Sequence, residues 1–320
     1  AEVHALAMAG EAARDATLFV TLEPCCHTGK TPPCTDAIVS AGIRRVVVAA
    51  TDPFPAVAGK SISILQQAGL QVDVGLLQQE ATRLTAPFRM LTMEKRPWVI
   101  AKWAMTIDGY LALPHARTDD SGESHQYQWI SSEISRAIVH DLRRRVDAIV
   151  VGVQTALADD PLLTARPSGS RPLVRVVLDR QARLPVSSRL VQTAHKYPVL
   201  VAVGPRAAKD QVKQLQDNGC EIWHSSTDQS SQMLIDLAHE FGARQMTNVL
   251  VEGGAHVLES CFKADIIDEV WAFLVPKILD ANAPSLRLRE ILSKTRVEAI
   301  DQTGGDLFVR GLLRHDLLGR

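Results

Sequence analysis

The sequence predicts an α/β protein of two units, and three observations support this prediction. The 320 residues exceed one ordinary domain, so two compact units with separate cores are expected. Apolar runs of strand length alternate with helical patterns, and many of these runs are apolar throughout, which is typical of parallel sheets covered on both faces. The charged, proline-ended segment TMEKRP (92–97) separates the two groups of elements, so we place the boundary there.

The first unit begins with a helical pattern over 1–13 and then alternates strands with helices. Strands are predicted by the β-rich and apolar runs at 17–24, 44–50 and 70–77. Helical patterns follow at 34–42, 60–68 and 78–93, and glycines end the first two of them.

The second unit repeats this alternation over a longer stretch. It opens with the strand WVIAKWAM (98–105), and a polar loop leads to a helix at 131–145 that carries a serine cap. Five further strands are predicted at 147–153, 173–179, 198–204, 247–254 and 268–276. Helical patterns at 207–217, 230–242 and 255–263 separate the later strands, and the run at 306–314 is expected to close the sheet.

The composition disfavours several classes of partner. Thirty-five basic and thirty-six acidic side chains give a net charge of -1, so the broad positive field needed for non-specific nucleic-acid binding is missing. No apolar run approaches the roughly 20 residues that span a bilayer, and no secretory signal opens the chain. We therefore expect a cytosolic protein without nucleic-acid or membrane partners. Because the chain opens inside a helical pattern, we also expect that residues preceding Ala1 have been cut away.

The segment LEPCCHTGKTPPC (22–34) holds three of the five cysteines. An odd number of cysteines crowded into a proline-rich loop fits a metal or redox site better than a disulfide framework. Cys25 and Cys34 suit zinc, since Pro24 fixes the approach and the dipole of the helix that begins at Cys34 favours a thiolate. Cys26 adjoins Cys25 and is expected to be a packing residue. A structural zinc site and a chance cluster remain alternatives.

Zinc nucleoside and nucleobase deaminases carry His-x-Glu upstream of their cysteines, and the glutamate moves protons without binding the metal. Glu2 lies at a suitable distance ahead of Cys25 for this role. The third ligand, a histidine, is then expected just before Ala1 and outside this chain. His4 and His27 are alternative ligands, although His4 lies beyond Glu2 and His27 is only two residues from Cys25.

Two sets of motifs carry a resemblance to a known family. TLEPCCHTGKTPPC and AGIRRVVVAATDPFPAVAGK (41–60) resemble the deaminase half of the bifunctional deaminase/reductase family of riboflavin biosynthesis. The reductase half of that family is similar to further segments in the expected order, namely AKWAMTIDGYLA (101–112), WISSE (129–133), LRRRVDAIVVGVQTALADDPLLTAR (142–166), VLVEGGAHVLESCF (249–262) and DEVWAFLVPKIL (268–279).

The resemblance implies the architecture and the chemistry. It implies a cytidine-deaminase-like three-layer α/β/α domain over 1–92, truncated at its start, and a dihydrofolate-reductase-like α/β domain over 97–320. The first would use Zn²⁺ to deaminate a diaminopyrimidinone phosphoribosylamine hydrolytically, with Glu2 moving the proton. The second would use NADPH to reduce the ribose to a ribityl chain. The implied partners are this phosphorylated pyrimidine and further copies of the chain in a homo-oligomer.

The resemblance also implies the reductase site residues. The VEGG turn (251–254) places glycines between a strand and a helix, where free backbone N–H groups can hold a cofactor phosphate. NADPH contacts are implied at Ala104, Trp129, Thr155, Asp159, Gly254, Ala255, His256, Val257, Leu258, Glu259 and Ser260. Substrate contacts are implied at Ser124, Arg143, Leu163, Arg166 and Glu252, with the two arginines at the phosphate.

Two departures from the family pattern affect these expectations. GESHQYQW (122–129) contains three additional residues, so either Ser124 or Tyr127 takes the position of the substrate serine. The first elements of a complete deaminase and its metal histidine would lie before Ala1, so the deaminase site expected in this chain is incomplete. The alternatives are a reductase with a structural deaminase-like domain, a zinc-binding interaction module, a folate-type reductase and, for 1–92, a nucleic-acid base deaminase.

Overall fold

The computed structural model divides the chain into two compact units that meet at Lys95 and Arg96. It describes residues 1–28, 32–54, 57–109, 111, 130–169, 171–278 and 288–313.

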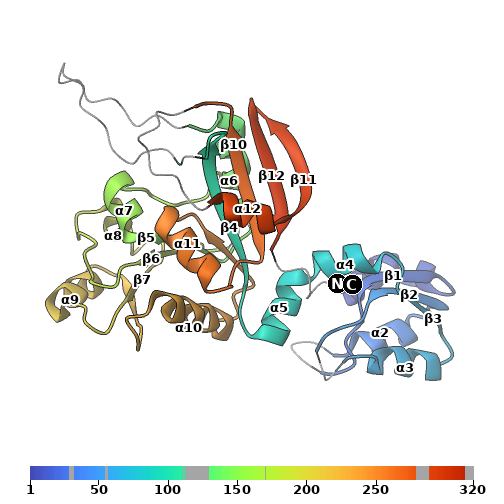
Figure 1. The fold of residues 1–320 in the computed structure, drawn as a ribbon. Helices are drawn as coiled ribbons and strands as arrows, with labels where there is room; N and C mark the ends of the chain where they lie inside the picture. The colour runs from blue at the N-terminus through green and yellow to red at the C-terminus, as the bar shows by residue number, and fades with distance from the viewer. Residues whose placement is uncertain are drawn as a thin grey trace, which may run out of the picture. The chain divides into compact units, whose positions relative to one another are not determined.

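The first unit is built on a three-stranded parallel sheet with the order β1-β2-β3. Its strands are β1 (Thr17–Leu22), β2 (Arg45–Ala50) and β3 (Gln71–Val74), and its first helices are α1 (Glu2–Ala9), α2 (Cys34–Ser40) and α3 (Lys60–Gln67). Figure 1 shows helices on both sides of this sheet. The core on one face joins Val46 and Val48 of β2 to Ile38 of α2 and Leu65 of α3.

The helix predicted over 78–93 is two helices, α4 (Gln78–Leu84) and α5 (Ala86–Glu94). Pro87 occupies the second position of α5 and has no N–H to donate to the carbonyl group four residues earlier. The break at Thr85 follows from this missing donor.

The second unit holds a nine-stranded sheet with the order β11-β12-β10-β4-β9-β5-β6-β7-β8. Its strands are β4 (Trp98–Thr106), β5 (Ala148–Gly152), β6 (Val174–Leu178), β7 (Val199–Val203), β8 (Glu221–His224), β9 (Asn248–Val251), β10 (Glu269–Val275), β11 (Arg296–Thr303) and β12 (Asp306–Leu312). The strands from β10 to β8 pair in parallel, whereas β12 and β11 are antiparallel additions at one edge. The sheet of the second unit is therefore a mixed sheet.

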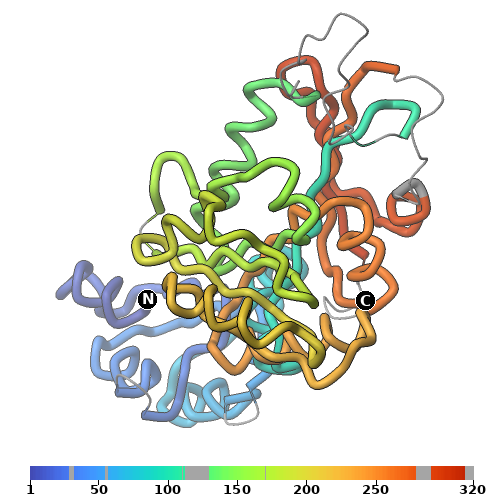
Figure 2. The backbone as a smooth tube through the Cα atoms, turned by 90° about the vertical axis from the view of Figure 1, so that its left-hand side faces the viewer, coloured from blue at the N-terminus to red at the C-terminus, as the bar shows by residue number. Residues whose placement is uncertain are grey.

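Helices cover this sheet. They are α6 (Glu133–Arg143), α7 (Val153–Asp159), α8 (Arg189–Gln192), α9 (Lys209–Asp217), α10 (Ser230–Ala243), α11 (Ala255–Lys263) and α12 (Leu288–Lys294). All residues of β5 and β7 are buried, as expected for strands covered on both faces. One face packs against α10 and α11, which contact each other and can be followed in Figures 1 and 2, through Leu237, Phe241 and Leu258.

Several elements were not predicted from the sequence, namely β8, β11, α7, α8 and α12. The strand β11 is an exposed edge strand and lacks an apolar run. It is paired with β12 through Gly304 and Gly305, which both have positive φ. A Gly-Gly pair between strands is a hairpin signal, because the favoured two-residue turns need positive φ.

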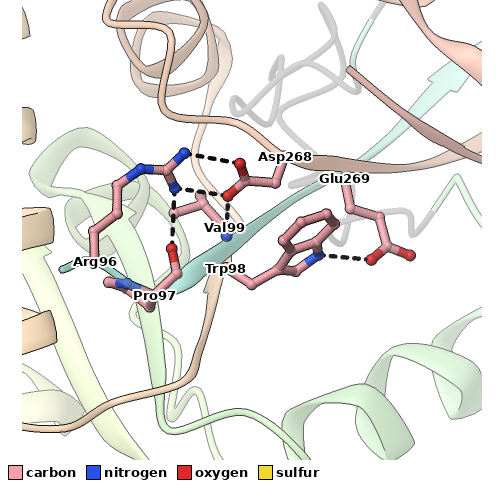
Figure 3. A network of polar contacts seen from close by, with 6 residues as sticks. All are labelled: Arg96, Pro97, Trp98, Val99, Asp268 and Glu269. Carbon is pink, nitrogen blue, oxygen red and sulfur yellow. Dashed lines mark hydrogen bonds and ion pairs between the residues drawn. The ribbon is translucent and has the colours of Figure 1, made fainter. Parts of the chain in front are cut away.

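A buried polar network fixes the point where the second unit begins (Figure 3). The Asp268 carboxylate accepts from both terminal nitrogens of Arg96, at 2.7 and 2.8 Å, and from the Val99 N–H at 2.8 Å. Next to it, the Glu269 carboxylate accepts from the indole N–H of Trp98 at 2.9 Å and from that of Trp271 at 2.8 Å. These contacts anchor β4 beside β10 at its first residue.

Within the described residues, no helix is both long and apolar enough to cross a membrane.

Candidate functional site

The cysteine loop of the first unit brings together three of the residues that the sequence singled out. Cys34 begins α2, as predicted, and its N–H donates to Cys25 Sγ at 3.3 Å. The Cys34 thiol donates to Glu2 Oε2 at 3.4 Å. Glu2 begins α1, so two helix starts and the loop end converge on one place.

The electrostatics of this cluster differ from the prediction. Burial, together with the hydrogen bonds that Cys34 makes with Cys25 and Glu2 and the negative charge of these two groups, raises the pKa of the Cys34 thiol to about 12. In the protein without a cation, desolvation and two acidic neighbours oppose the thiolate that the dipole of α2 favours. A divalent cation reverses this balance, since it attracts all three groups in their charged forms.

A buried glutamate holds the start of the loop. Glu23 is 3% exposed, and its carboxylate accepts from the backbone N–H groups of Asp52, Gly59 and Ser61 at 3.2, 2.9 and 3.2 Å. These three donors lie between β2 and the first turn of α3. Glu23 thereby ties Cys25, two residues later, to the end of the neighbouring strand.

The cluster fits a zinc ion in part. Two cysteine sulfurs are ligands that zinc prefers, and the adjacent carboxylate suits proton transfer. His4 and His27 are exposed, and within the described part of the chain no three His, Cys, Asp or Glu side chains form a group that could hold a metal ion.

The second unit contains a carboxylate surrounded by cations. The side chain of Glu252 is 10% exposed and accepts from Arg143 Nε at 2.7 Å and Arg143 Nη2 at 2.9 Å, while Lys102 Nζ lies 3.7 Å away. Burial alone raises the pKa of Glu252, but Arg143 and Lys102 lower it to about 2. Burial of Lys102 lowers the pKa of its ammonium group, and Glu252 opposes this shift.

Two residues of the charged cluster around Glu252, Lys102 and His140, were not predicted from the sequence. Lys102 is the only charged residue in the apolar strand WVIAKWAM, and such a lysine needs a buried partner, so a signal was present. His140 lies one helical turn before Arg143, and burial followed by the charges of Arg143 and Arg166 lowers its pKa. No feature of the sequence distinguishes this histidine from other helix residues.

The Glu-Gly-Gly turn is tightly packed. It follows β9, and Gly254 is the N-cap of α11, as the sequence predicted. A Cβ atom at Gly253 would lie 2.5 Å from Val257 Cβ, and one at Gly152 would lie 2.8 Å from Val257 Cγ2. The start of α11 therefore lies directly against the end of β5, and this close approach leaves no room for a side chain at Gly152 or Gly253.

The other predicted cofactor residues lie at the same edge of the sheet. Ala104 is near the end of β4, Thr155 and Asp159 are in α7 after β5, and residues 254–260 follow β9. The three strands are neighbours, and the carboxyl ends of adjacent parallel strands are a common ligand site. The side chain of Leu258 is fully buried in the core, so only its backbone is available to a ligand.

Of the remaining residues predicted at the reductase site, the structure describes Leu163 and Arg166. Leu163 is buried and has φ of 53°, whereas Arg166 is exposed. Ser124, Tyr127 and Trp129 lie outside the described residues.

Two family models match the chain. The model described as the RibD C-terminal domain matches residues 97–309, and that described as the cytidine and deoxycytidylate deaminase zinc-binding region matches residues 1–50. The order of the two matches is the order of the two units.

Curated relatives align along most of the chain. The riboflavin biosynthesis protein RibD of Aquifex aeolicus is 36% identical over 315 residues, which cover 97% of this chain and 84% of the relative. RibD of Escherichia coli is 34% identical over 304 residues, which cover 89% of this chain and 77% of the relative.

Solved structures give the same result. RibD of Acinetobacter baumannii superposes with a TM-score of 0.78 at 30% identity, covering 98% of this chain and 85% of that one. The deaminase/reductase of Thermotoga maritima superposes with a TM-score of 0.74 at 30% identity, covering 97% and 83%.

Proposed function

The chain belongs to the RibD family of bifunctional deaminase/reductases, and from this premise we propose which reaction each unit performs and which residues perform it. Membership confirms the predicted function in riboflavin biosynthesis and the predicted pairing of a deaminase-like unit with a RibD-type reductase domain. In the proposal, residues 1–92 deaminate a diaminopyrimidinone phosphoribosylamine by hydrolysis. Residues 97–320 then reduce its ribose to a ribityl chain with NADPH.

The observation that carries the deaminase proposal is the convergence of Glu2, Cys25 and Cys34. Cys25 and Cys34 would hold Zn²⁺ together with a third ligand that the described residues do not include. A bound zinc ion supplies the activation of water for attack on the ring carbon that carries the amine. The Glu2 carboxylate, next to Cys34, would accept a proton from water and pass it to the leaving nitrogen.

Charge supports the proposed substrate of the second unit. Lys102 and Arg143 pair with Glu252, and the charges of Arg143 and Arg166 act on the neighbouring His140, so this region holds three cations and one carboxylate. A surplus of positive charge suits a phosphorylated substrate. Nε and Nη2 of Arg143 already donate to Glu252, so Arg143 would bind the phosphate without releasing Glu252. The exposed Arg166 would bind the phosphate directly.

The cofactor proposal rests on the edge formed by β4, β9 and β5. NADPH, which supplies hydride, would lie along this edge against Ala104, Thr155, Asp159 and the start of α11. The backbone N–H groups in the first turn of α11 would face a cofactor phosphate. Trp129 and, for the substrate, Ser124 and Leu163 complete the proposed set.

The experiment measures both half-reactions on the full-length gene product. We expect about one zinc per chain, ammonia release from the diaminopyrimidinone phosphoribosylamine, and NADPH oxidation with the deaminated product. Cys34→Ser should lose zinc and ammonia release while retaining NADPH oxidation, and Cys26→Ser, the matched control, should retain zinc. A Cys34→Ser protein that keeps its zinc would contradict the metal assignment. NADPH oxidation without ammonia release by the wild type would instead establish a reductase with a structural first unit.

A further inference from the structure

A buried arginine lies outside all the residues assigned above. Arg175 is in β6, an interior strand, and is 1% exposed. Within the described residues, every hydrogen bond of its guanidinium group goes to an uncharged oxygen. The acceptors are Leu162 O at 3.2 Å, Thr193 Oγ1 at 2.9 Å, Leu190 O and Thr193 O at 3.3 Å, and Tyr197 O. Burial lowers the pKa of Arg175 to about 10, so the group remains charged at neutral pH.

Packing alone does not account for an arginine at this position. A buried cation carries a desolvation penalty that an apolar side chain of similar length avoids. What the guanidinium adds is a set of fixed donors that hold several carbonyl groups at once. The guanidinium group therefore acts on the segments that carry those carbonyl groups.

One of these segments is 160–166, which carries the proposed substrate residues Leu163 and Arg166. Leu163 adopts φ of 53°, a left-handed conformation that is unfavourable for a residue other than glycine. Such a conformation persists where surrounding contacts enforce it. Arg175 holds the carbonyl group directly before Leu163, and Arg143 Nη1 donates to the carbonyl group directly after it, Thr164 O, at 3.4 Å.

Arg175 also reaches the start of this segment through α8. Asp160 Oδ1 accepts from the N–H of Arg189, the first residue of α8, at 2.7 Å. Arg175 holds Leu190 O in the same helix and both the carbonyl and the hydroxyl oxygens of Thr193 after it. The Arg175 side chain thus holds segment 160–166 at two points, directly at Leu162 and through α8 at Asp160.

We propose that Arg175 is a positioning residue of the reductase site, which fixes segment 160–166 so that Leu163 and Arg166 meet the phosphorylated substrate. The proposal rests on the substrate roles proposed above for these two residues. Arg175 itself touches neither substrate nor cofactor. It acts through the carbonyl group of Leu162 and through α8.

The test compares three variants of the full-length protein. Arg175→Met should raise the KM for the phosphoribosylaminouracil substrate by about tenfold or more, because small displacements of binding groups have effects of this size. Its kcat and the Kd for NADPH should stay within about threefold of the wild type. Arg175→Lys, which keeps the charge and some donors, should restore part of the KM. Leu215→Ala, a buried substitution in α9, is the control for lost stability and should leave the KM unchanged.

Amide hydrogen exchange at 162–164 reads the position of the segment without any turnover. We expect exchange to become at least about tenfold faster in Arg175→Met and to stay unchanged in Leu215→Ala. An unchanged KM in Arg175→Met, or a KM that rises equally in Leu215→Ala, would overturn the proposal. If Arg175→Met does not fold, Arg175→Lys carries both measurements. If the wild type does not oxidise NADPH with this substrate, the proposed function fails, and the exchange data alone decide whether Arg175 positions the segment.

Discussion

Arg143 and Glu252, 109 positions apart in the chain, meet at two points, with Nε 2.7 Å from Oε1 and Nη2 2.9 Å from Oε2. The contact joins the last turn of α6 to the turn after β9. It sets the charge state of a buried carboxylate and fixes the orientation of an arginine in a single geometry.

The first prediction concerns the pH dependence of this pair. The pKa of Glu252 in the folded protein is about 2, below its ordinary value of 4.5, so the pair contributes stability above pH 4.5. This contribution is lost as pH falls through about 2. Glu252→Gln should therefore be less stable than the wild type at pH 7, and the gap should narrow below pH 4.5. Urea unfolding at several pH values measures it, and a gap that stays constant down to pH 3 would argue against the ionised pair.

The second prediction separates Arg143 from its neighbour. Arg143→Lys keeps the charge but cannot make the two-point contact, so reductase kcat/KM should fall about 10- to 100-fold, the equivalent of one charge-assisted hydrogen bond of about 1.5–3 kcal/mol. Arg144→Lys is the matched control, because Arg144 is exposed and pairs with Asp141 at 3.3 Å. Steady-state kinetics should show no more than a twofold change for the control. Equal losses in both variants would contradict the role given to Arg143.

The third prediction tests the packing at Val257. Gly152→Ala and Gly253→Ala should each destabilise the second unit by about 1–3 kcal/mol and weaken NADPH binding, because an added Cβ displaces the start of α11. Combining each with Val257→Ala gives different results. The clash at Gly152 is with Cγ2 and is removed, whereas the clash at Gly253 includes Val257 Cβ at 2.5 Å and remains. Double-mutant cycles in thermal unfolding measure this difference. Equal rescue of both substitutions would contradict the close approach.

The fourth prediction concerns the network at the start of the second unit. Asp268 is fully buried and pairs with Arg96 at 2.7 Å, so Asp268→Asn should lower the unfolding free energy of this unit by about 3–5 kcal/mol. Asp141→Asn, at an exposed ion pair, should change it by less than about 1 kcal/mol. Urea denaturation followed by tryptophan fluorescence distinguishes the two, since Trp98 and Trp103 are buried in this unit. A loss below 1 kcal/mol for Asp268→Asn would refute the stabilising role of the pair.

Patterns that depend on near neighbours in the chain were predicted well. The apolar runs located β4, β5, β6 and β7 to within one or two residues, and the Ser132 side chain caps α6 as expected. The Gly-Gly turn was placed correctly between β9 and α11. Strand β11 was missed because an exposed edge strand needs no apolar run, and its pairing with β12 depends on a turn.

By itself, the sequence determined the family, the two α/β units and the cysteine loop, because these depend on hydrophobic periodicity and on motifs of fixed spacing. The tertiary structure decided which charges meet. These four residues, Lys102 in β4, His140 and Arg143 in α6, and Glu252 after β9, come from three separate places in the chain, and only the pairing of β4 with β9 and the packing of α6 bring them together. It also decided the charge state of Cys34 and the partners of Arg175, since desolvation depends on everything that surrounds a group and not on its neighbours along the chain.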